Sequence, residues 1–472
     1  MLLPELRARS AFSFLEGSSL PETLIEQASK LEIPAVALLD RDAVSGAVRF
    51  HKEAKKRGVR AWIGAEVTAE EGFRYPLIAA TREGYQNLCR LITRVKLQRR
   101  AARFSDIEDY AAGLLCLASD PLAWALDQGA APAMVDKLRG VFPHGRVAID
   151  IQRHFLREEE ARNQTFLQMG LPVIAANGVS HATREERPLM DVLTCTRHHT
   201  NIDEAGRLLA RNSERFFKSA RQMESLFTDI PHAIDTARAF GERIEFTLED
   251  LGYQFPLYPV PAGETMDSFL WKRTFEGAAR RYQPMYERAQ RQLERELKLI
   301  EKLKLAGYFL IVWDIVEFCR REGIMVQGRG SAANSAVCYS LGITAVDPVG
   351  MDLLFERFLS EERGEWPDID LDLASGDQRE QTIQYVYRRY GQLGAAMTAN
   401  VISYRARSAV RDAGKALGFP EEQLSRLSTL IGRGGYECDR NNEPGGAAER
   451  MEKAGLPMDQ PRVRHLHSMV QA

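Results

Sequence analysis

Several features that would identify common protein classes are missing from this 472-residue sequence. Its six cysteines are scattered, and none has the C-x-x-C spacing typical of zinc knuckles or redox motifs. No run of 18 apolar residues occurs, so the sequence predicts no membrane-spanning helix. The first residues, Met1-Leu2-Leu3-Pro4-Glu5, are unlike a secretory signal peptide. These features fit a reducing compartment, and we expect a cytoplasmic protein without a membrane partner.

The sequence also lacks an excess of charge of either sign. It has 63 Lys and Arg residues against 65 Asp and Glu residues, which gives a net charge of −2 at pH 7. This balance argues against a protein whose whole surface binds a polyanion, although it is compatible with a local basic groove. Apolar residues make up 44% of the chain, which is ordinary for a globular protein long enough for two or three domains.

The most informative segment that is present is a row of alternating carboxylates, Trp366-Pro367-Asp368-Ile369-Asp370-Leu371-Asp372-Leu373. At the period of a strand, the aspartates share one face and the apolar residues share the other. Like charges this close repel each other, and a divalent cation removes the repulsion. Mg²⁺ prefers oxygen ligands and is often bound by one or two carboxylates together with substrate phosphates. A solvated strand edge or a Ca²⁺ loop remains an alternative for this segment alone.

A loop of small residues lies upstream of this segment, Gln327-Gly328-Arg329-Gly330-Ser331-Ala332-Ala333-Asn334-Ser335. Glycine lets the backbone approach a ligand closely, and amides at a helix N-terminus bind phosphate. Ser331 can donate a hydrogen bond to a phosphate oxygen, and Arg329 supplies a permanent charge of planar geometry. Such a loop alone is often only a turn. Followed by a carboxylate strand, it indicates a nucleotidyl-transfer site.

The remaining chain gives a coarse organisation. Strands are predicted over 35–39, 61–67 and 171–177, and helices between them, the first with Ser18 and Ser19 as caps. Repeated strand–helix units with polar residues at strand ends indicate a barrel or a parallel sheet. Beyond a proline-rich connector at 256–263, helices are predicted over 291–304 and 308–318. The glycine-rich residues from Gly432 onward are predicted to form a loop-rich tail.

These motifs together resemble the bacterial C-family DNA polymerases, the family of the polymerase III alpha subunit. The similarity is carried by the loop and the carboxylate strand and by three further motifs: Gly307-Tyr308-Phe309-Leu310-Ile311-Val312-Trp313-Asp314, Phe355-Glu356-Arg357-Phe358-Leu359 and Arg411-Asp412-Ala413-Gly414-Lys415-Ala416-Leu417-Gly418. The segment Leu359-Ser360-Glu361-Glu362-Arg363-Gly364-Glu365 is similar in sequence to the corresponding segment of the error-prone, damage-induced branch of this family. The resemblance implies an α/β chain: a distorted β/α barrel of the polymerase and histidinol phosphatase (PHP) type over 1–255, a partial palm similar to that of polymerase beta over 264–400, and the start of a helical thumb over 401–472.

The resemblance also implies roles for individual residues. Asp370 and Asp372 would be catalytic and would bind two Mg²⁺ ions, with Asp368 a less certain neighbour. The deoxynucleoside triphosphate would be bound by Gly328, Arg329, Gly330, Ser331 and Arg357. DNA phosphates would face Arg405, Arg407 and Arg411, for which a solvated helix face is the alternative.

The N-terminal part resembles the PHP domain but departs from its cluster of metal ligands. The family's His-x-His stands here as Arg7-Ala8-Arg9, its Asp-His stands as Asp40-Arg41, and a later Asp is replaced by Gly178. Glu66 is retained, and His181 lies near a ligand position. A guanidinium stays protonated and cannot coordinate a cation, so we expect no metal, proofreading or phosphatase activity in this domain. Alternatively, the two arginines simply pair with Asp40 and Glu66.

The implied function is error-prone, DNA-directed DNA synthesis in DNA repair, translesion synthesis and damage-induced mutagenesis. The implied partners are a DNA primer-template and deoxynucleoside triphosphates, with other mutagenesis proteins and the sliding clamp for a full-length protein. The family needs a third palm carboxylate and fingers beyond the thumb, so we expect an N-terminal fragment that is inactive alone. The alternatives are a non-catalytic remnant or interaction module and a PHP-type phosphoesterase, against which the lost histidines argue.

Overall fold

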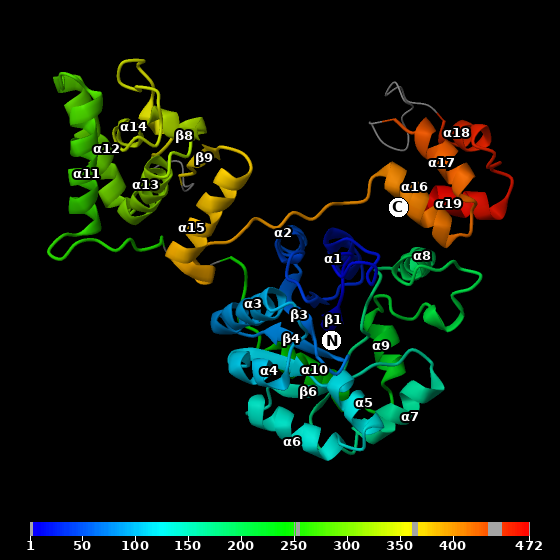
Figure 1. The fold of residues 1–472 in the computed structure, drawn as a ribbon. Coiled ribbons are helices and arrows are strands. Elements are labelled where there is room, and N and C mark those ends of the chain that lie inside the picture. Colours follow the sequence, from blue (N-terminus) through cyan, green and yellow to red (C-terminus); the bar gives the residue numbers. More distant parts are fainter. Residues whose placement is uncertain (1–2, 250, 252–254, 361–366, 433–445, 472) are drawn as a thin grey trace. The chain divides into compact units, whose positions relative to one another are not determined.

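The computed structural model describes residues 3–249, 251, 255–360, 367–432 and 446–471. The chain divides into two compact units (Figure 1), one formed by Met1–Leu251 with Ile402–Ala472 and the other by Gly252–Val401. Each unit has a hydrophobic core of its own. Over the ranges described, none of the helices combines the length and the apolar character that crossing a bilayer requires.

The first unit is built on a seven-stranded sheet whose strands are neighbours in sequence order. The strands are β1 (Glu5–Ala8), β2 (Ala35–Arg41), β3 (Arg60–Thr68), β4 (Arg74–Ala79), β5 (Leu114–Leu117), β6 (Val147–Ile151) and β7 (Val173–Ala175). All neighbours are parallel except β4, which is antiparallel to β3 and β5. A parallel bridge between Ala8 and Val179 brings the two ends of the sheet together, so the sheet curls into a distorted barrel. The predicted PHP-type α/β barrel is confirmed.

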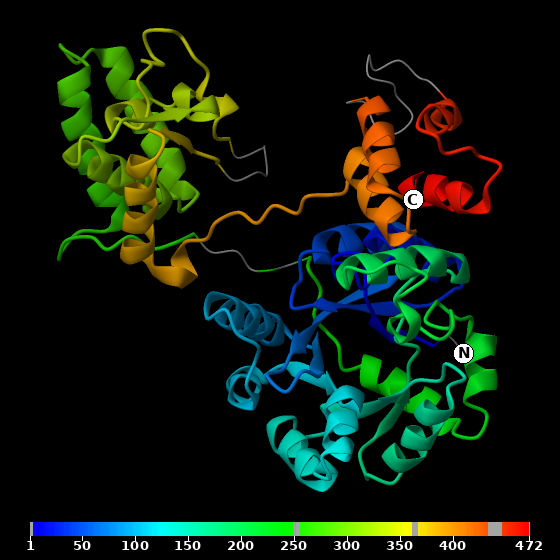
Figure 2. The ribbon, with the colours of Figure 1, turned by 45° about the vertical axis from the view of Figure 1, so that its right-hand side comes forward.

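The connecting helices lie around the outside of this sheet (Figure 2). They are α1 (Pro21–Lys30), α2 (Ala47–Arg57), α3 (Arg82–Leu97), α4 (Phe104–Tyr110), α5 (Ser119–Asp127), α6 (Ala131–Val141) and α7 (Arg157–Phe166). Three further helices follow β7: α8 (Arg187–Arg197), α9 (Ala220–Leu226) and α10 (His232–Gly241). The predicted serine caps of α1 are wrong, because Leu20 occupies the N-cap position and the Ser19 hydroxyl instead binds the Glu186 carboxylate.

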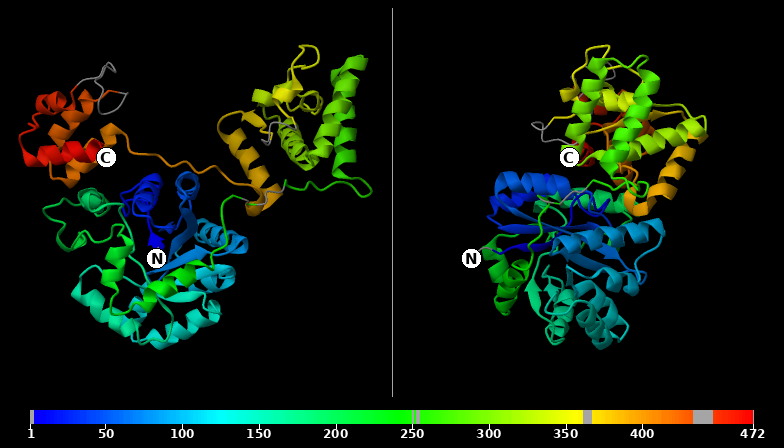
Figure 3. Two further views of the ribbon diagram at one scale, coloured as in Figure 1. Left: turned by 180° about the vertical axis from the view of Figure 1, so that it is seen from behind. Right: turned by 90° about the vertical axis from the view of Figure 1, so that its left-hand side faces the viewer.

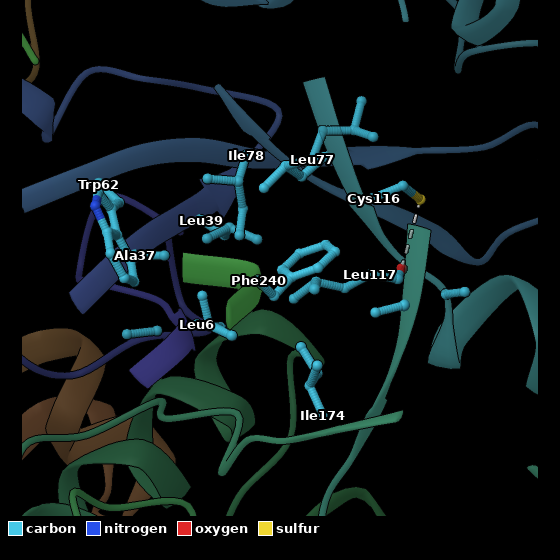
Figure 4. Close-up of a cluster of buried hydrophobic side chains, with 14 of the residues drawn as sticks. Leu6, Ala37, Leu39, Trp62, Leu77, Ile78, Cys116, Leu117, Ile174 and Phe240 are labelled. Carbon is cyan, nitrogen blue, oxygen red and sulfur yellow. Dashed lines mark hydrogen bonds between the residues drawn. The ribbon is translucent and has the colours of Figure 1, made fainter. Parts of the chain in front are cut away.

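The interior of the barrel is a packed core rather than a pore (Figure 4). Leu6, Leu39, Leu117 and Ile174 come from four different strands, and they belong to one buried cluster with Phe240 of α10. Side chains that fill the barrel in this way fix the positions of the strand ends, where the polar side chains of the domain gather.

Residues after 402 add a group of helices to the same unit (Figures 1 and 3). They are α16 (Ala406–Ala416), α17 (Glu421–Leu430), α18 (Ala447–Lys453) and α19 (Pro461–Gln471). Their apolar faces form one cluster with Val192 and Cys195 of α8. The helical character expected here is present, whereas a loop-rich tail is wrong for residues 446–471. Residues 433–445, where several of the glycines lie, are outside the described residues.

The second unit packs helices against a two-stranded antiparallel sheet. The helices are α11 (Met266–Arg281), α12 (Glu287–Lys302), α13 (Ala306–Arg321), α14 (Ala336–Ser340) and α15 (Asp377–Gly394), and the strands are β8 (Val326–Arg329) and β9 (Asp370–Leu373). The predicted helices over 291–304 and 308–318 are therefore confirmed as α12 and α13. Leu293, Leu297 and Ile300 of α12 are buried at helical spacing, as their pattern requires.

Candidate active site

The pairing of β8 with β9 brings the small-residue loop and the carboxylate strand together. Gln327 lies opposite Asp372, and Arg329 lies opposite Asp370. Side chains directly opposite each other in a ladder lie on the same face of the sheet, so both aspartates share a face with Arg329. Asp370 and Asp372 are exposed, while Leu371 between them packs against the core. The structure thus has the predicted alternation. Asp368, just before β9, is also exposed, and Trp366 lies outside the described residues.

Arg329 pairs with both carboxylates of β9. Its Nε atom lies 3.3 Å from Asp372 Oδ1 and 3.6 Å from Asp370 Oδ2. All three side chains are more than half exposed, and an ion pair in this setting contributes little stability. The guanidinium therefore balances the two negative charges without locking them, and a divalent cation could take its place.

The loop that follows β8 needs glycine at two positions. The Gly328 amide donates a hydrogen bond to the Ile343 carbonyl at 2.6 Å, and a Cβ atom at Gly328 would lie only 2.8 Å from that oxygen. Gly330 has a φ of 70°, which other residues adopt at a cost. A Cβ at Gly330 would lie 4.0 Å from Asp370 Oδ2, so this turn lies beside the first carboxylate. Ser331 and Arg357 line one cavity of about 650 Å³ with Gly330.

The helix N-terminus after this loop is already occupied by a carboxylate of the chain. Glu296, which α12 places in the core, accepts hydrogen bonds from the amides of Ala336 and Val337, both at 3.0 Å, and from the Ser335 hydroxyl at 2.8 Å. Burial raises the pKa of Glu296 to about 7, although the amides of Val337 and Ala336 oppose that rise. The expectation that amides of this helix bind phosphate is therefore wrong for these two amides, and a phosphate near the loop would meet Gly330 and Ser331 instead.

The residues on this face suit magnesium chemically. Asp370 and Asp372 offer exposed carboxylate oxygens on adjacent outward positions of one strand, and oxygen is the donor that Mg²⁺ prefers. Within the ranges that the structure describes, no group of three or more His, Cys, Asp or Glu side chains could hold a metal ion. The site therefore offers two carboxylates and leaves further coordination positions to substrate oxygens or water.

At the degenerate PHP positions, one arginine is surrounded by carboxylates. Arg7 is buried and donates to Glu66 at 2.9 Å, to Asp150 at 2.8 Å and to Asp120 at 2.6 Å. Burial would lower the pKa of Arg7, but the three carboxylates raise it above its usual value. Burial would likewise raise the pKa of Glu66, but Arg9 and Arg7 hold that pKa below its usual value. This guanidinium is a built-in cation whose charge satisfies the acidic side chains.

The other degenerate positions are also engaged within the protein. Arg9 donates to Glu66 at 3.0 Å, and Arg41 pairs with Glu16. Of the two pairings weighed for Arg7 and Arg9, only the one with Glu66 is confirmed. Asp40 is bound instead by the hydroxyls of Ser10 and Ser13, at 2.8 and 2.7 Å, and by the Ser10 amide.

His181, expected near a ligand position, is buried and bound at both ring nitrogens. Its Nδ1 lies 3.0 Å from the Ser180 hydroxyl and its Nε2 lies 3.4 Å from the Ser213 carbonyl. Burial, assisted by the charge of Arg187, lowers the pKa of His181 to about 4, so the ring is neutral at pH 7. Because its ring nitrogens already have partners, His181 is a packed polar side chain in this structure.

The three arginines expected to face DNA differ in their surroundings. Arg405 is the exposed N-cap residue of α16, and Arg411 is exposed on the same helix. Arg407 donates from Nε and Nη2 to the Ile431 carbonyl at 3.1 and 2.8 Å, which ties α16 to the end of α17. Arg407 thus has a structural partner, while the guanidiniums of Arg405 and Arg411 are accessible.

Comparisons with known proteins agree with the arrangement of both units. Residues 268–471 match the family model described as the bacterial DNA polymerase III alpha NTPase domain, and residues 5–154 match the PHP domain. Over 98% of its length, the chain is 40% identical to a protein named error-prone DNA polymerase from Brucella abortus biovar 1 (strain 9-941) and 38% identical to one of the same name from Anaeromyxobacter sp. (strain K). The chain belongs to the C family of bacterial DNA polymerases.

This C-family chain spans less than half the length of those relatives, covering 43% of the Brucella protein and 48% of the Anaeromyxobacter protein. Among solved structures, a two-domain protein from Bacteroides vulgatus with a predicted PHP-like metal-dependent phosphoesterase is 13% identical. The match covers 51% of this chain and 69% of that protein, with a TM-score of 0.26, which is too low an overlap to carry an argument.

Sequence patterns gave a signal for one important residue that the motifs did not identify. Glu296 lies on the apolar stripe of α12, one residue before Leu297 and three after Leu293. A charged residue at a buried helical position needs a partner, and such a residue can be recognised from the spacing alone. Its partners, the amides after Ser335, could not be identified without the fold.

Replacing Arg7 by Met tests whether this arginine neutralises the buried carboxylates around it. The variant leaves Asp150 buried without its cation and removes one of the three arginines that pair with Glu66, and we expect a loss of about 3–5 kcal/mol in the free energy of unfolding. Denaturant unfolding of the whole chain, followed by circular dichroism, measures the loss. The control is Arg41→Met, which removes a partly exposed partner of Glu16 and should cost about 1 kcal/mol or less. Equal losses from both variants would contradict a special role for Arg7.

Replacing Glu296 by Gln tests the buried carboxylate of the second unit. The pKa of Glu296 rises from 4.5 to about 7 on folding, so the ionised form is disfavoured in the folded state. Wild-type stability should therefore fall as the pH rises from about 4.5 to above 7, by about 3 kcal/mol for this group. Relative to wild type, Glu296→Gln should gain stability between pH 5 and pH 8 in thermal unfolding. The control is Glu287→Gln, at the exposed start of the same helix. If the difference in stability between Glu296→Gln and wild type stays constant with pH, Glu296 is not responsible for the pH dependence of stability.

Proposed function

We propose that this C-family chain provides the metal-binding and nucleotide-binding part of an error-prone, DNA-directed DNA polymerase. The observation that carries the proposal is the exposed pair Asp370 and Asp372, which the β8–β9 ladder holds beside the Gly330–Ser331 turn. The names of the relatives support the error-prone type, and with it translesion synthesis and damage-induced mutagenesis. The substrates would be deoxynucleoside triphosphates and a DNA primer-template, in the bacterial cytoplasm.

Each group on this face has a chemical task in the proposed reaction. Asp370 and Asp372 would hold Mg²⁺, which when bound lowers the pKa of the attacking hydroxyl and stabilises charge on the leaving phosphate. Arg329 would exchange its carboxylate partners for the triphosphate, since its ion pairs are exposed and weak. Ser331 would donate a hydrogen bond to a phosphate oxygen, and Arg357, which lines the same cavity, would add positive charge.

The other parts of the chain would serve this reaction indirectly. Arg405 and Arg411 are accessible for DNA phosphates, whereas Arg407 would mainly hold α16 in place. The barrel would act as a structural platform without phosphoesterase activity, because Arg7 and Arg9 put fixed positive charge on its retained Glu66. Other mutagenesis proteins and the sliding clamp are further proposed partners of a full-length protein.

The number of carboxylates in the palm bears on whether this chain can extend a primer by itself. The resemblance implies three carboxylates, of which Asp370 and Asp372 lie on β9. We therefore expect that these 472 residues bind nucleotide and DNA but need more polypeptide to extend a primer. The alternative is a non-catalytic interaction module.

Two assays with one pair of proteins test this proposal. Wild type and the double variant Asp370→Asn, Asp372→Asn are first compared in primer extension with Mg²⁺ and all four deoxynucleoside triphosphates. The same proteins are then titrated with a fluorescent deoxynucleoside triphosphate, with and without Mg²⁺. We expect no extension from either protein, and Mg²⁺-dependent nucleotide binding that is weakened about tenfold or more in the double variant.

The remaining outcomes are also informative. Extension that the double variant loses would support the polymerase and refute the limit on activity. Nucleotide binding that is absent from wild type, or unchanged in the double variant, would contradict the proposed site and favour a non-catalytic module. Ser331→Ala should weaken nucleotide binding as well, while Ser408→Ala, an exposed change outside this unit, provides the matched control.

A further inference from the structure

The motif Gly307–Asp314 has no task yet in the proposed reaction. It lies in the first half of α13, a helix that packs against β8 and α15 (Figure 1). Its apolar residues Phe309 and Leu310 are buried, which core packing explains. Two polar side chains of the motif, Tyr308 and Asp314, bond instead to the segments before and after the carboxylate strand β9.

The strand that carries Asp370 and Asp372 belongs to a sheet of only two strands. In the part of the chain that the structure describes, β9 pairs with β8 alone, and both carboxylates are exposed. A two-stranded ribbon is marginally stable by itself. The ligands of a metal site must nevertheless be held to within about 0.5 Å. The two carboxylates therefore need anchors from outside the ribbon.

One anchor lies just before the first carboxylate. The Ile369 amide donates a hydrogen bond to the Tyr308 hydroxyl at 3.0 Å. The Tyr308 ring is held in turn by the rings of Phe255 and Phe309, whose centroids lie 5.7 and 6.1 Å away. The backbone at the start of β9 is thus fixed by a side chain of α13.

The second anchor is a carboxylate that binds three tyrosine hydroxyls. Asp314 accepts from Tyr385 at 2.7 Å and from Tyr390 at 2.8 Å, both on α15. It also accepts from Tyr258 at 3.1 Å, and Arg389 adds positive charge with its Nε atom 3.6 Å away. The Asp314 side chain is only 13% exposed, so solvent competes little for these bonds. Because only three residues separate β9 from α15, this cluster fixes the chain at the end of the strand.

The hydroxyls of α15 in this cluster stay protonated at neutral pH. Burial, assisted by the hydrogen bond to Asp314, raises the pKa of Tyr385 to about 12, and the same causes raise the pKa of Tyr390. The Tyr385 ring also stacks on Phe318 of α13 at 3.9 Å and packs in a small apolar cluster with Leu373 of β9. The contact between α13 and α15 therefore extends to the strand itself.

We infer that Tyr308 and Asp314 are positioning residues for the two metal-binding carboxylates. This role rests on the proposed function of Asp370 and Asp372 as metal ligands. Tyr308 would fix the strand before Asp370, and Asp314 would fix it after Asp372 through α15. Neither side chain would touch the metal or the nucleotide, and their effect would be to set the geometry of the carboxylates before a metal binds.

The test uses tyrosine-to-phenylalanine changes in the whole chain, which remove hydroxyls and keep the rings. The double variant Tyr385→Phe, Tyr390→Phe removes both donors of α15 from Asp314, and Tyr308→Phe removes the acceptor of the Ile369 amide. The matched control is Tyr387→Phe, since Tyr387 is also on α15 but its hydroxyl has no hydrogen-bond partner among the described residues.

The first measurement is hydrogen exchange of the backbone amides, without metal or nucleotide, followed by mass spectrometry. We expect amides of the segment 369–373 to exchange about tenfold faster in the double variant and in Tyr308→Phe, because the strand opens more often. Tyr387→Phe should exchange like wild type. Equal acceleration in Tyr387→Phe would overturn the inference, because any change on α15 would then disturb the strand.

The second measurement is Mn²⁺ binding, followed by electron paramagnetic resonance. The double variant and Tyr308→Phe should each bind Mn²⁺ about tenfold more weakly than wild type, and Tyr387→Phe should bind it equally well. The spectrum of the bound ion should also change shape in the anchor variants, which a loss of stability alone does not produce.

The outcomes separate this role from the proposed function. If Mn²⁺ binding depends on Asp370 and Asp372 but is unchanged in affinity and spectrum in both anchor variants, the inference fails and the proposed function stands. If wild type binds no Mn²⁺, both fail. Because Tyr308→Phe and the double variant alter different anchors, one of them still tests the inference if the other does not fold.

Discussion

The pairing of guanidinium groups with clustered carboxylates is the interaction that governs the candidate sites of both units. Acidic side chains that converge on one point repel each other unless a cation lies among them. In the barrel, that cation is Arg7, which is buried against Glu66 and Asp150. In the second unit it is Arg329, which is exposed beside Asp370 and Asp372. The two arginines form the same kind of ion pair, but the pairs differ in strength because Arg7 is buried and Arg329 is exposed.

Burial decides which of these two sites can still exchange its cation. Removing Arg7 from its partners would leave charges in a low-dielectric interior, so this arginine is not readily displaced from its carboxylates. Arg329 loses little when it leaves its carboxylates, because solvent screens the pair. The carboxylates around Arg7 are therefore tied to a buried partner, whereas Asp370 and Asp372 have an exposed and weakly held one.

Much of the architecture could be predicted from local sequence patterns. The alternation from Asp368 to Leu373 predicted a strand with its carboxylates on one face, because side chains on a strand alternate strictly. Leu293, Leu297 and Ile300 predicted a helix for the corresponding reason. Arg7 and Arg9 were expected to pair with an acidic side chain, and both donate to Glu66.

The features that could not be predicted depend on partners distant in the sequence. Ser19 looked like a helix cap, but its hydroxyl is bound by Glu186. Arg407 remains a predicted DNA contact, and the fold adds a partner that the sequence did not reveal, the Ile431 carbonyl. The amides of Ala336 and Val337 looked free for phosphate, but both donate to Glu296. In each case the local chemistry was identified correctly, and the fold supplied a partner from elsewhere in the chain.

Titration with Mn²⁺, followed by the electron paramagnetic resonance of the free ion, tests the central claim most directly. The account predicts weak binding to wild type, no such binding to the Asp370→Asn, Asp372→Asn double variant, and tighter binding to Arg329→Gln, which lacks the competing guanidinium. Binding that persists in the double variant would contradict the claim, because the metal would then be bound by other residues, including those around Arg7.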